Sequence, residues 1–150
     1  MKALYVHAAH DLRLEDCAAE APGHGQVRLR LARGGICGSD LHYYGHGGFG
    51  PVRLREPMIL GHEVSGHVAA LGKGVTELSL GDLVAVSPSR PCGTCRHCRE
   101  GRRNHCENMR FYGSAMPFPH IQGAFREVLA ADAEQCVRAE GLSAGEAAMA

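Results

Sequence analysis

The sequence predicts a mainly β domain with short helices, and three observations lead to that fold class. Val27–Leu31 (VRLRL) alternates apolar and basic residues with the period of two that is typical of a half-buried strand. Turn signals rich in Gly and Pro separate this run from other short β-prone runs. Four of the seven cysteines fall within fifteen residues, Cys92 to Cys106, which indicates a metal-binding lobe between strands.

The remaining elements follow in chain order. Seven runs rich in apolar residues are expected to be strands: Met1–His7, the stretch around Leu12 and Leu14, Val27–Leu31, Met58–Leu60, Glu63–Leu71, Leu83–Val86 and Ala124–Ala130. The turns expected between them contain glycine: Pro22–Gly25, Gly72–Gly74 and Gly81-Asp82. The segment from about 88 to 111 is expected to be irregular and to form the cysteine-rich lobe.

The chain length suits one domain, since domains usually have roughly 100–200 residues. Ser143 and Glu146 have the spacing of a capping box, so a helix is expected to begin near the end of the chain. Because a natural domain rarely ends one turn into a helix, we expect residues 1–150 to be one domain of a longer, truncated protein.

Composition excludes several classes of protein. The 16 basic residues balance 16 acidic ones, which argues against a nucleic-acid or membrane-surface partner. With 45% hydrophobic and 21% charged residues, the chain is expected to be globular. Its longest apolar runs are far shorter than the roughly 20 residues of a membrane span, and its first residues do not resemble a secretory signal. These features favour a cytoplasmic location.

The four clustered cysteines predict a structural zinc site. Cys92-x2-Cys95-x2-Cys98-x7-Cys106 offers a closed shell of four thiolates, which leaves no coordination position for a substrate. Three alternatives stay open: an iron–sulfur cluster, although the last gap of seven differs from the ferredoxin spacing; a zinc module that contacts nucleic acid; and free thiols. His97 or His105 could replace one thiolate, although four cysteines make this unnecessary.

A second set of candidate metal ligands lies earlier in the chain. Cys37 lies in a glycine-rich segment and His62 in Gly61-His62-Glu63, and a thiol, an imidazole and a carboxylate together are suitable zinc ligands. Asp40 could accept a hydrogen bond from the second ring nitrogen of His62 and so fix its orientation. The alternative is that Cys37 is a small buried hydrophobe and that His62 is structural.

Two further motifs are dismissed. Gly45–Gly50 matches G-x-G-x-x-G, but no predicted strand precedes it and Pro51 follows it where a helix would begin, so a flexible loop is expected. His62–His67 resembles a zinc-protease box, but its histidines are five residues apart rather than four, and Gly66 disfavours a helix.

The two sets of candidate ligands, in this order, make the chain resemble the zinc-containing medium-chain alcohol and polyol dehydrogenases. The resemblance rests on the four-cysteine lobe and on two motifs, Cys37-Gly38-Ser39-Asp40-x-His42 and Gly61-His62-Glu63-x2-Gly66-x5-Gly72-x2-Val75. It implies a GroES-like, partly open β-barrel catalytic domain. It also implies that NAD or NADP binds to a Rossmann domain that is absent from this chain.

The resemblance also implies a role for each site residue. Cys37 and His62 would ligate a catalytic zinc ion, with Glu63 beside it as a neighbour or an alternate ligand. Ser39 would receive the proton of the substrate hydroxyl, and His42 would relay it to solvent. Tyr43 would line the substrate site. In the polyol branch of the family a further zinc-directed Glu would follow Ala150.

The implied activity is oxidation of a secondary alcohol of a polyol or sugar acid, with hydride transfer to NAD(P), by a homo-oligomer in the full-length protein. A sugar acid carries a carboxylate, for which Arg is the usual bidentate partner, so Arg53, Arg55 and Arg110 are candidate substrate contacts. For each of these arginines, a solvated surface charge is the alternative. For the chain as a whole, the alternative is a non-enzymatic GroES-like zinc-binding module.

Overall fold

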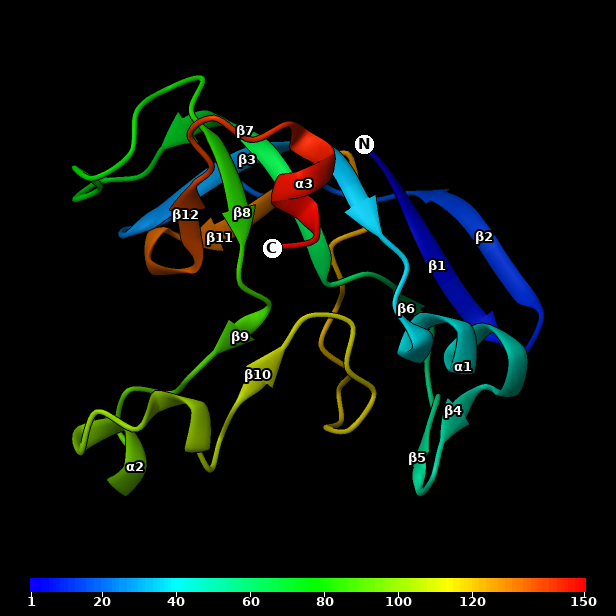
Figure 1. Cartoon of the computed structure of the whole chain (residues 1–150). Coiled ribbons are helices and arrows are strands. Elements are labelled where there is room, and N and C mark those ends of the chain that lie inside the picture. The colour runs from blue at the N-terminus through cyan, green and yellow to red at the C-terminus, as the bar shows by residue number, and fades with distance from the viewer.

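The computed structural model describes residues 1–150, and antiparallel sheets form most of its regular secondary structure (Figure 1). The strands are β1 (Lys2–Ala8), β2 (Asp11–Asp16), β3 (Gln26–Gly35), β4 (Gly48–Phe49), β5 (Val52–Arg53), β6 (Met58–Ile59), β7 (Glu63–Leu71), β8 (Leu83–Val86), β9 (Ser89–Arg90), β10 (Arg110–Phe111), β11 (Val128–Asp132) and β12 (Cys136–Arg138). The helices are α1 (Gly38–His46), α2 (Arg96–Arg99) and α3 (Ala144–Ala148), with 3₁₀ turns at Arg103–His105 and Ala133–Gln135. The predicted mainly β fold with short helices is confirmed.

The largest sheet has five strands in the order β11-β3-β7-β8-β12 and carries the main core. On β3, Val27 and Leu29 are fully buried, as the period-two alternation predicts. They join a cluster of eleven buried residues that includes Val84 and Leu129 from neighbouring strands. This core fixes the relative positions of β3 and β7, the two strands next to the second set of candidate ligands.

A second, smaller core lies between the three-stranded sheet β2-β1-β6 and helix α1. Val6, Tyr43, Met58, Leu60 and Ala115 form it. α1 is the longest helix, with nine residues, and no helix has the length and apolar character needed to cross a bilayer.

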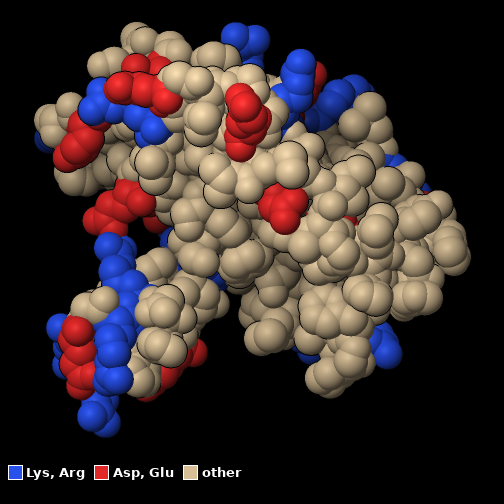
Figure 2. Space-filling model, in the orientation of Figure 1, with Lys and Arg blue, Asp and Glu red and all other residues tan.

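The cysteine-rich lobe projects from the sheets on the short β9–β10 ribbon (Figure 1). No residue between positions 88 and 111 is buried, which confirms that this segment has almost no core of its own. Figure 2 shows basic side chains, all of them Arg, gathered on the lobe with acidic side chains beside them.

The last predicted barrel strand is displaced along the chain. The sequence predicts a strand at Ala124–Ala130, whereas β11 runs from Val128 to Asp132. The Phe125 N–H donates to the Leu60 carbonyl, and the Phe125 carbonyl accepts from the Leu4 N–H. These bonds connect the first residues of the predicted run to β1 and to the segment after β6, so this part of the chain does not continue the β11–β3 ladder.

Candidate metal centres

Cys37, His62 and Glu63 converge at one end of the main sheet. Their potential ligand atoms all lie within 4.8 Å of one another, although Cys37 is 25 residues from His62 along the chain. The β3–β7 ladder brings the two segments together, because Gly35 at the end of β3 pairs with Glu63 at the start of β7. Cys37 follows two residues later as the N-cap of α1.

Asp40 holds the two segments of this second donor set together. Its side chain is 3% exposed; Oδ2 accepts a hydrogen bond from the Cys37 N–H at 3.0 Å, and Oδ1 accepts one from the Gly61 N–H at 3.1 Å. The predicted hydrogen bond to His62 is not formed in this geometry, because Nδ1 lies 3.9 Å from Oδ1. The carboxylate therefore fixes the backbone next to each ligand, and does not bind the imidazole directly.

Two glycines lie beside this donor set. A Cβ on Gly35 would lie 2.5 Å from the Glu63 carboxylate oxygen Oε2, so a larger residue there would displace this carboxylate. Gly61 has φ +90°, a conformation that favours glycine, and a Cβ there would overlap the ring of Phe125. Glycine at these two positions therefore leaves room for the Glu63 carboxylate and for the Phe125 ring.

Ser39 and His42 lie three residues apart on α1, so they share one side of the helix that Cys37 caps. Ser39 is half-buried and His42 is exposed, with its ring centroid 6.2 Å from that of Phe49. The pair therefore extends from the second donor set toward solvent.

Tyr43 lies in the second core, and its contact with a substrate stays a prediction. The side chain is 2% exposed in the second core, and its hydroxyl accepts a hydrogen bond from the Ala115 N–H at 3.0 Å. Burial raises the pKa of this phenol. In the structure Tyr43 packs α1 against the loop that contains Ala115.

The three candidate arginines fall on two separate surfaces. Arg53 and Arg55 line one cavity of about 340 Å³ together with Met116, and the Arg55 guanidinium lies 4.4 Å from the centre of the Phe118 ring. Arg110 is not beside them. It pairs with Arg90 across the β9–β10 ribbon and lines a different cavity, to which Phe111 also contributes.

The four lobe cysteines also come together, with their sulfur atoms within 4.8 Å of one another. Backbone N–H groups point at these sulfurs: that of Cys92 donates to Cys106 Sγ at 3.2 Å, and that of Cys95 to Cys92 Sγ at 3.3 Å. Donors aimed at sulfur stabilise thiolates, the form that binds a metal.

The proton affinities of these thiols differ. Hydrogen bonds from Thr94 and Cys95 lower the pKa of Cys92 to about 5. Desolvation and the neighbouring thiols raise the pKa of Cys98 to about 12. Metal binding by all four sulfurs must therefore displace a proton that Cys98 holds at neutral pH.

Sequence reasoning did not identify Phe111 or His120. The Phe111 ring centroid lies 5.3 Å from that of His62, a contact that depends on where β10 is placed. His120 is 5% exposed; its Nε2 accepts from the Arg55 N–H, and its Nδ1 donates to the Pro117 carbonyl, each at 2.9 Å. Neither role has a local signal in the sequence.

Neither dismissed motif has the geometry that its usual chemistry needs. Residues 45–50 span the end of α1 and the strand β4, not a strand followed by a helix, so the flexible loop expected there is wrong: β4 pairs with β5. His62–His67 enters strand β7, so its two histidines do not lie on one helical face.

Fold and site together define a GroES-like β domain with a four-thiol lobe and a second, mixed set of metal ligands, as in the catalytic domain of a zinc-dependent dehydrogenase. Residues 23–141 match the alcohol dehydrogenase GroES-like domain. The chain belongs to the zinc-containing medium-chain polyol dehydrogenase family.

Individual relatives support the same family. The L-idonate 5-dehydrogenase (NAD(P)(+)) of Escherichia coli K12 is 49% identical over 109 residues, which are 73% of this chain and 31% of the relative. The sorbitol dehydrogenase of Bacillus subtilis is 40% identical over 125 residues, 83% of this chain and 34% of the relative. The crystal structure of L-idonate 5-dehydrogenase from E. coli K-12 has a TM-score of 0.85 at 40% identity, over 91% of this chain and 39% of that one. The chain thus spans about a third of the length of these curated relatives.

Proposed function

We propose that this chain is the catalytic-domain part of a zinc-dependent oxidoreductase that oxidises a secondary alcohol of a polyol or sugar acid and transfers hydride to NAD(P). One observation carries the proposal: the Cys37, His62 and Glu63 donor atoms converge within 4.8 Å, next to the helix that carries Ser39 and His42. A site with one thiol, one imidazole and one carboxylate can bind zinc and keep a position for a substrate.

The residues present fit zinc at both places. The lobe offers four sulfurs that accept backbone N–H hydrogen bonds, the chemistry of a closed structural site. The second donor set is built on backbone fixed by Asp40, and Gly35 leaves room for the Glu63 carboxylate. We assign one structural zinc to Cys92, Cys95, Cys98 and Cys106, and one catalytic zinc to Cys37 and His62 with Glu63 beside it.

Helix α1 carries the two residues that we propose move the substrate proton, Ser39 and His42. Zinc, when bound, supplies a Lewis acid that lowers the pKa of the substrate alcohol. The Ser39 hydroxyl would accept the substrate proton as it gives its own proton toward His42, and the exposed His42 imidazole would release a proton to water. The Phe111 ring lies against the His62 ring, with their centroids 5.3 Å apart.

The substrate class and the partners are also proposals. The relatives that match this chain include enzymes named for L-idonate and for sorbitol. An L-idonate-type sugar acid would present a carboxylate, which arginine binds well. Arg53 and Arg55 are available for such a contact, because they line one cavity and form no ion pair in the structure. We propose these two arginines as its partners, and a cytoplasmic homo-oligomer that binds NAD or NADP through a domain outside these 150 residues.

Metal content tests the proposal without a need for turnover. The zinc-loaded chain is expected to contain two zinc ions, and Cys37→Ser to lose one while the far ultraviolet circular dichroism spectrum is unchanged. Cys17→Ser is the matched control, because Cys17 lies outside both donor sets. One zinc ion per chain, unaffected by Cys37→Ser, would instead identify a structural zinc module with no catalytic centre.

The arginine assignment needs the longer protein that contains this chain. There, Arg53→Ala and Arg55→Ala are expected to raise KM for L-idonate about tenfold and to leave KM for sorbitol almost unchanged, because only idonate loses a charge-assisted contact. Arg99→Ala, in the lobe, is the control. Equal effects on both substrates contradict the assignment.

A further inference from the structure

A cavity of about 230 Å³ lies beside the β9–β10 ribbon and is lined by three arginines, Arg90, Arg110 and Arg126. Arg90 and Arg110 are directly opposite each other in the antiparallel ladder, so their side chains leave the same face of the ribbon. Like charges in such a pair destabilise a sheet. The fold therefore brings three guanidinium groups to one hollow at an electrostatic cost.

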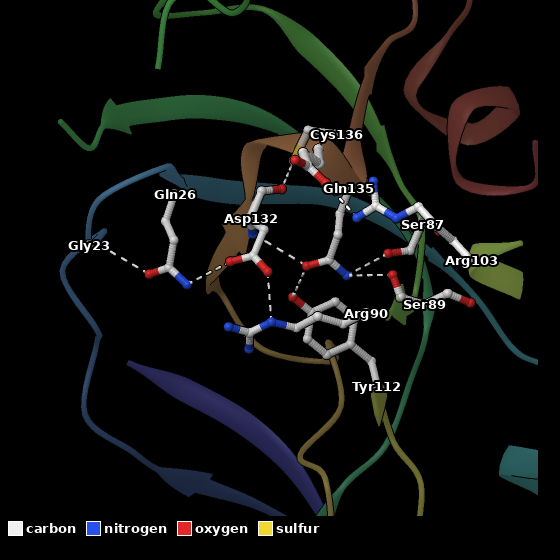
Figure 3. Close-up of polar contacts among 11 residues, drawn as sticks. Gly23, Gln26, Ser87, Ser89, Arg90, Arg103, Tyr112, Asp132, Gln135 and Cys136 are labelled. Carbon is white, nitrogen blue, oxygen red and sulfur yellow. Dashed lines mark hydrogen bonds and ion pairs between the residues drawn. The ribbon is translucent and has the colours of Figure 1, made fainter. Parts of the chain in front are cut away.

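Internal contacts use only part of these guanidinium groups. Arg90 pairs through Nε with Asp132 Oδ2 at 2.6 Å, part of a network that also joins Asp132 to Gln26 (Figure 3). Arg126 donates through Nε to the Gly123 carbonyl at 2.9 Å. Arg110 has no carboxylate within 4.0 Å. All three side chains keep terminal N–H groups that these contacts do not use.

The other groups around the cavity add one more donor. The Gln122 side-chain oxygen accepts from the Ile59 N–H at 2.8 Å, which leaves the Gln122 amide nitrogen free to donate. Both ring nitrogens of His120 are already hydrogen-bonded. The acidic groups are Glu20, which also lines the cavity, and Asp132, so three positive charges face two carboxylates.

We propose that this cavity binds the phosphate group of a small ligand. Arg110 and the free terminal nitrogens of Arg90 and Arg126 hold the phosphate oxygens. Guanidinium groups bind phosphate oxygens in pairs, and the bound anion offsets the repulsion between Arg90 and Arg110. Such a ligand would connect the ribbon that carries the lobe to the segment before β11. Arg110 thereby receives a role separate from substrate binding, and the proposal stands independently of the proposed function.

The test is a ¹⁵N NMR titration of the zinc-loaded chain with inorganic phosphate, and separately with glycerol 1-phosphate, at constant ionic strength set with sodium chloride. Saturable shifts are expected for the amides of Arg110 and Arg126. Tighter binding of glycerol 1-phosphate identifies a phosphate ester as the ligand class, and equal binding identifies the phosphate group alone.

Three variants complete the test. Arg110→Ala is expected to weaken binding by about tenfold or more, since it removes a charge-assisted contact. Glu20→Gln is expected to tighten binding, because a competing carboxylate is lost. Arg99→Ala, an exposed lobe arginine, should bind like the original chain and controls for any effect of phosphate on the zinc lobe. Shifts that do not saturate, or that are equal in Arg110→Ala and Arg99→Ala, overturn the proposal.

Discussion

Replacement of Asp40 by Asn tests how the second donor set is held together. The carboxylate accepts hydrogen bonds from the N–H groups of Cys37 and Gly61 while it is 3% exposed. Asn keeps one acceptor oxygen but places an NH₂ group against the other N–H. A hydrogen bond to a charged acceptor contributes about 1.5–3 kcal/mol, and a buried N–H without a partner costs a similar amount, so a loss of about 2–4 kcal/mol is expected.

The same substitution should weaken zinc binding. Because both backbone segments that Asp40 fixes carry a candidate ligand, the affinity for the second zinc ion is expected to fall about 10- to 100-fold, as for other residues that orient metal ligands. Urea unfolding in excess zinc measures the stability, and competition with a chromophoric chelator measures the affinity.

Asp82→Asn is the matched control. Asp82 Oδ2 accepts one backbone hydrogen bond, from the Ser79 N–H at 2.9 Å, in a turn outside both donor sets. A loss of about 1 kcal/mol with no change in zinc affinity is expected. If Asp40→Asn also leaves the zinc affinity unchanged, Asp40 does not position the ligands and the reasoning is refuted.

Three further predictions concern other parts of the molecule. Burial raises the pKa of Cys136 to about 12 from 9.0, so the protonated thiol stabilises the fold fully below pH 9 and this contribution is lost as the pH rises. Between pH 8 and 10, the free energy of unfolding in urea should therefore fall by about 1.4 kcal/mol more for the original chain than for Cys136→Ala. Equal decreases in the two proteins would exclude the thiol as the cause. Gly35→Ala should displace the Glu63 carboxylate and change the second zinc affinity, whereas Gly38→Ala, with open space around it, should not; the chelator competition measures both. Cys98→Ser should release the structural zinc and disorder only positions 88–111 in an NMR spectrum, because no buried core residue lies there; loss of dispersion across the sheets would contradict this.

The sequence predicts the strands of the main sheet because burial there follows a local pattern. Val27 and Leu29 alternate with charged residues, and the structure buries both completely. Helix α1 was not predicted. It contains Gly38 and Gly45, which lower helix propensity. A local hydrogen bond from the Cys37 N–H to Asp40 caps its start, and two tertiary contacts hold it: the hydrogen bond from the Gly61 N–H to Asp40 and the burial of Tyr43.

The candidate ligands could be found from the sequence because their residue types are rare and their spacing is specific. Side-chain direction could not be found in this way. The sequence groups Arg110 with Arg53 and Arg55 as candidate substrate contacts, but Arg110 lines a different cavity from the other two. Which face a residue occupies depends on ladder register, and register in a two-residue ribbon has no local signal.

One short ribbon also connects two candidate sites. Phe111 and Arg110 are neighbours on β10 and both line the cavity of the three arginines, and the Phe111 ring centroid lies 5.3 Å from that of His62. A ligand that pulls Arg110 toward Arg126 therefore acts on the strand whose next residue packs on the second donor set. If phosphate binds as proposed, it should also shift the NMR signals of the His62 ring, and this shift should vanish in Arg110→Ala.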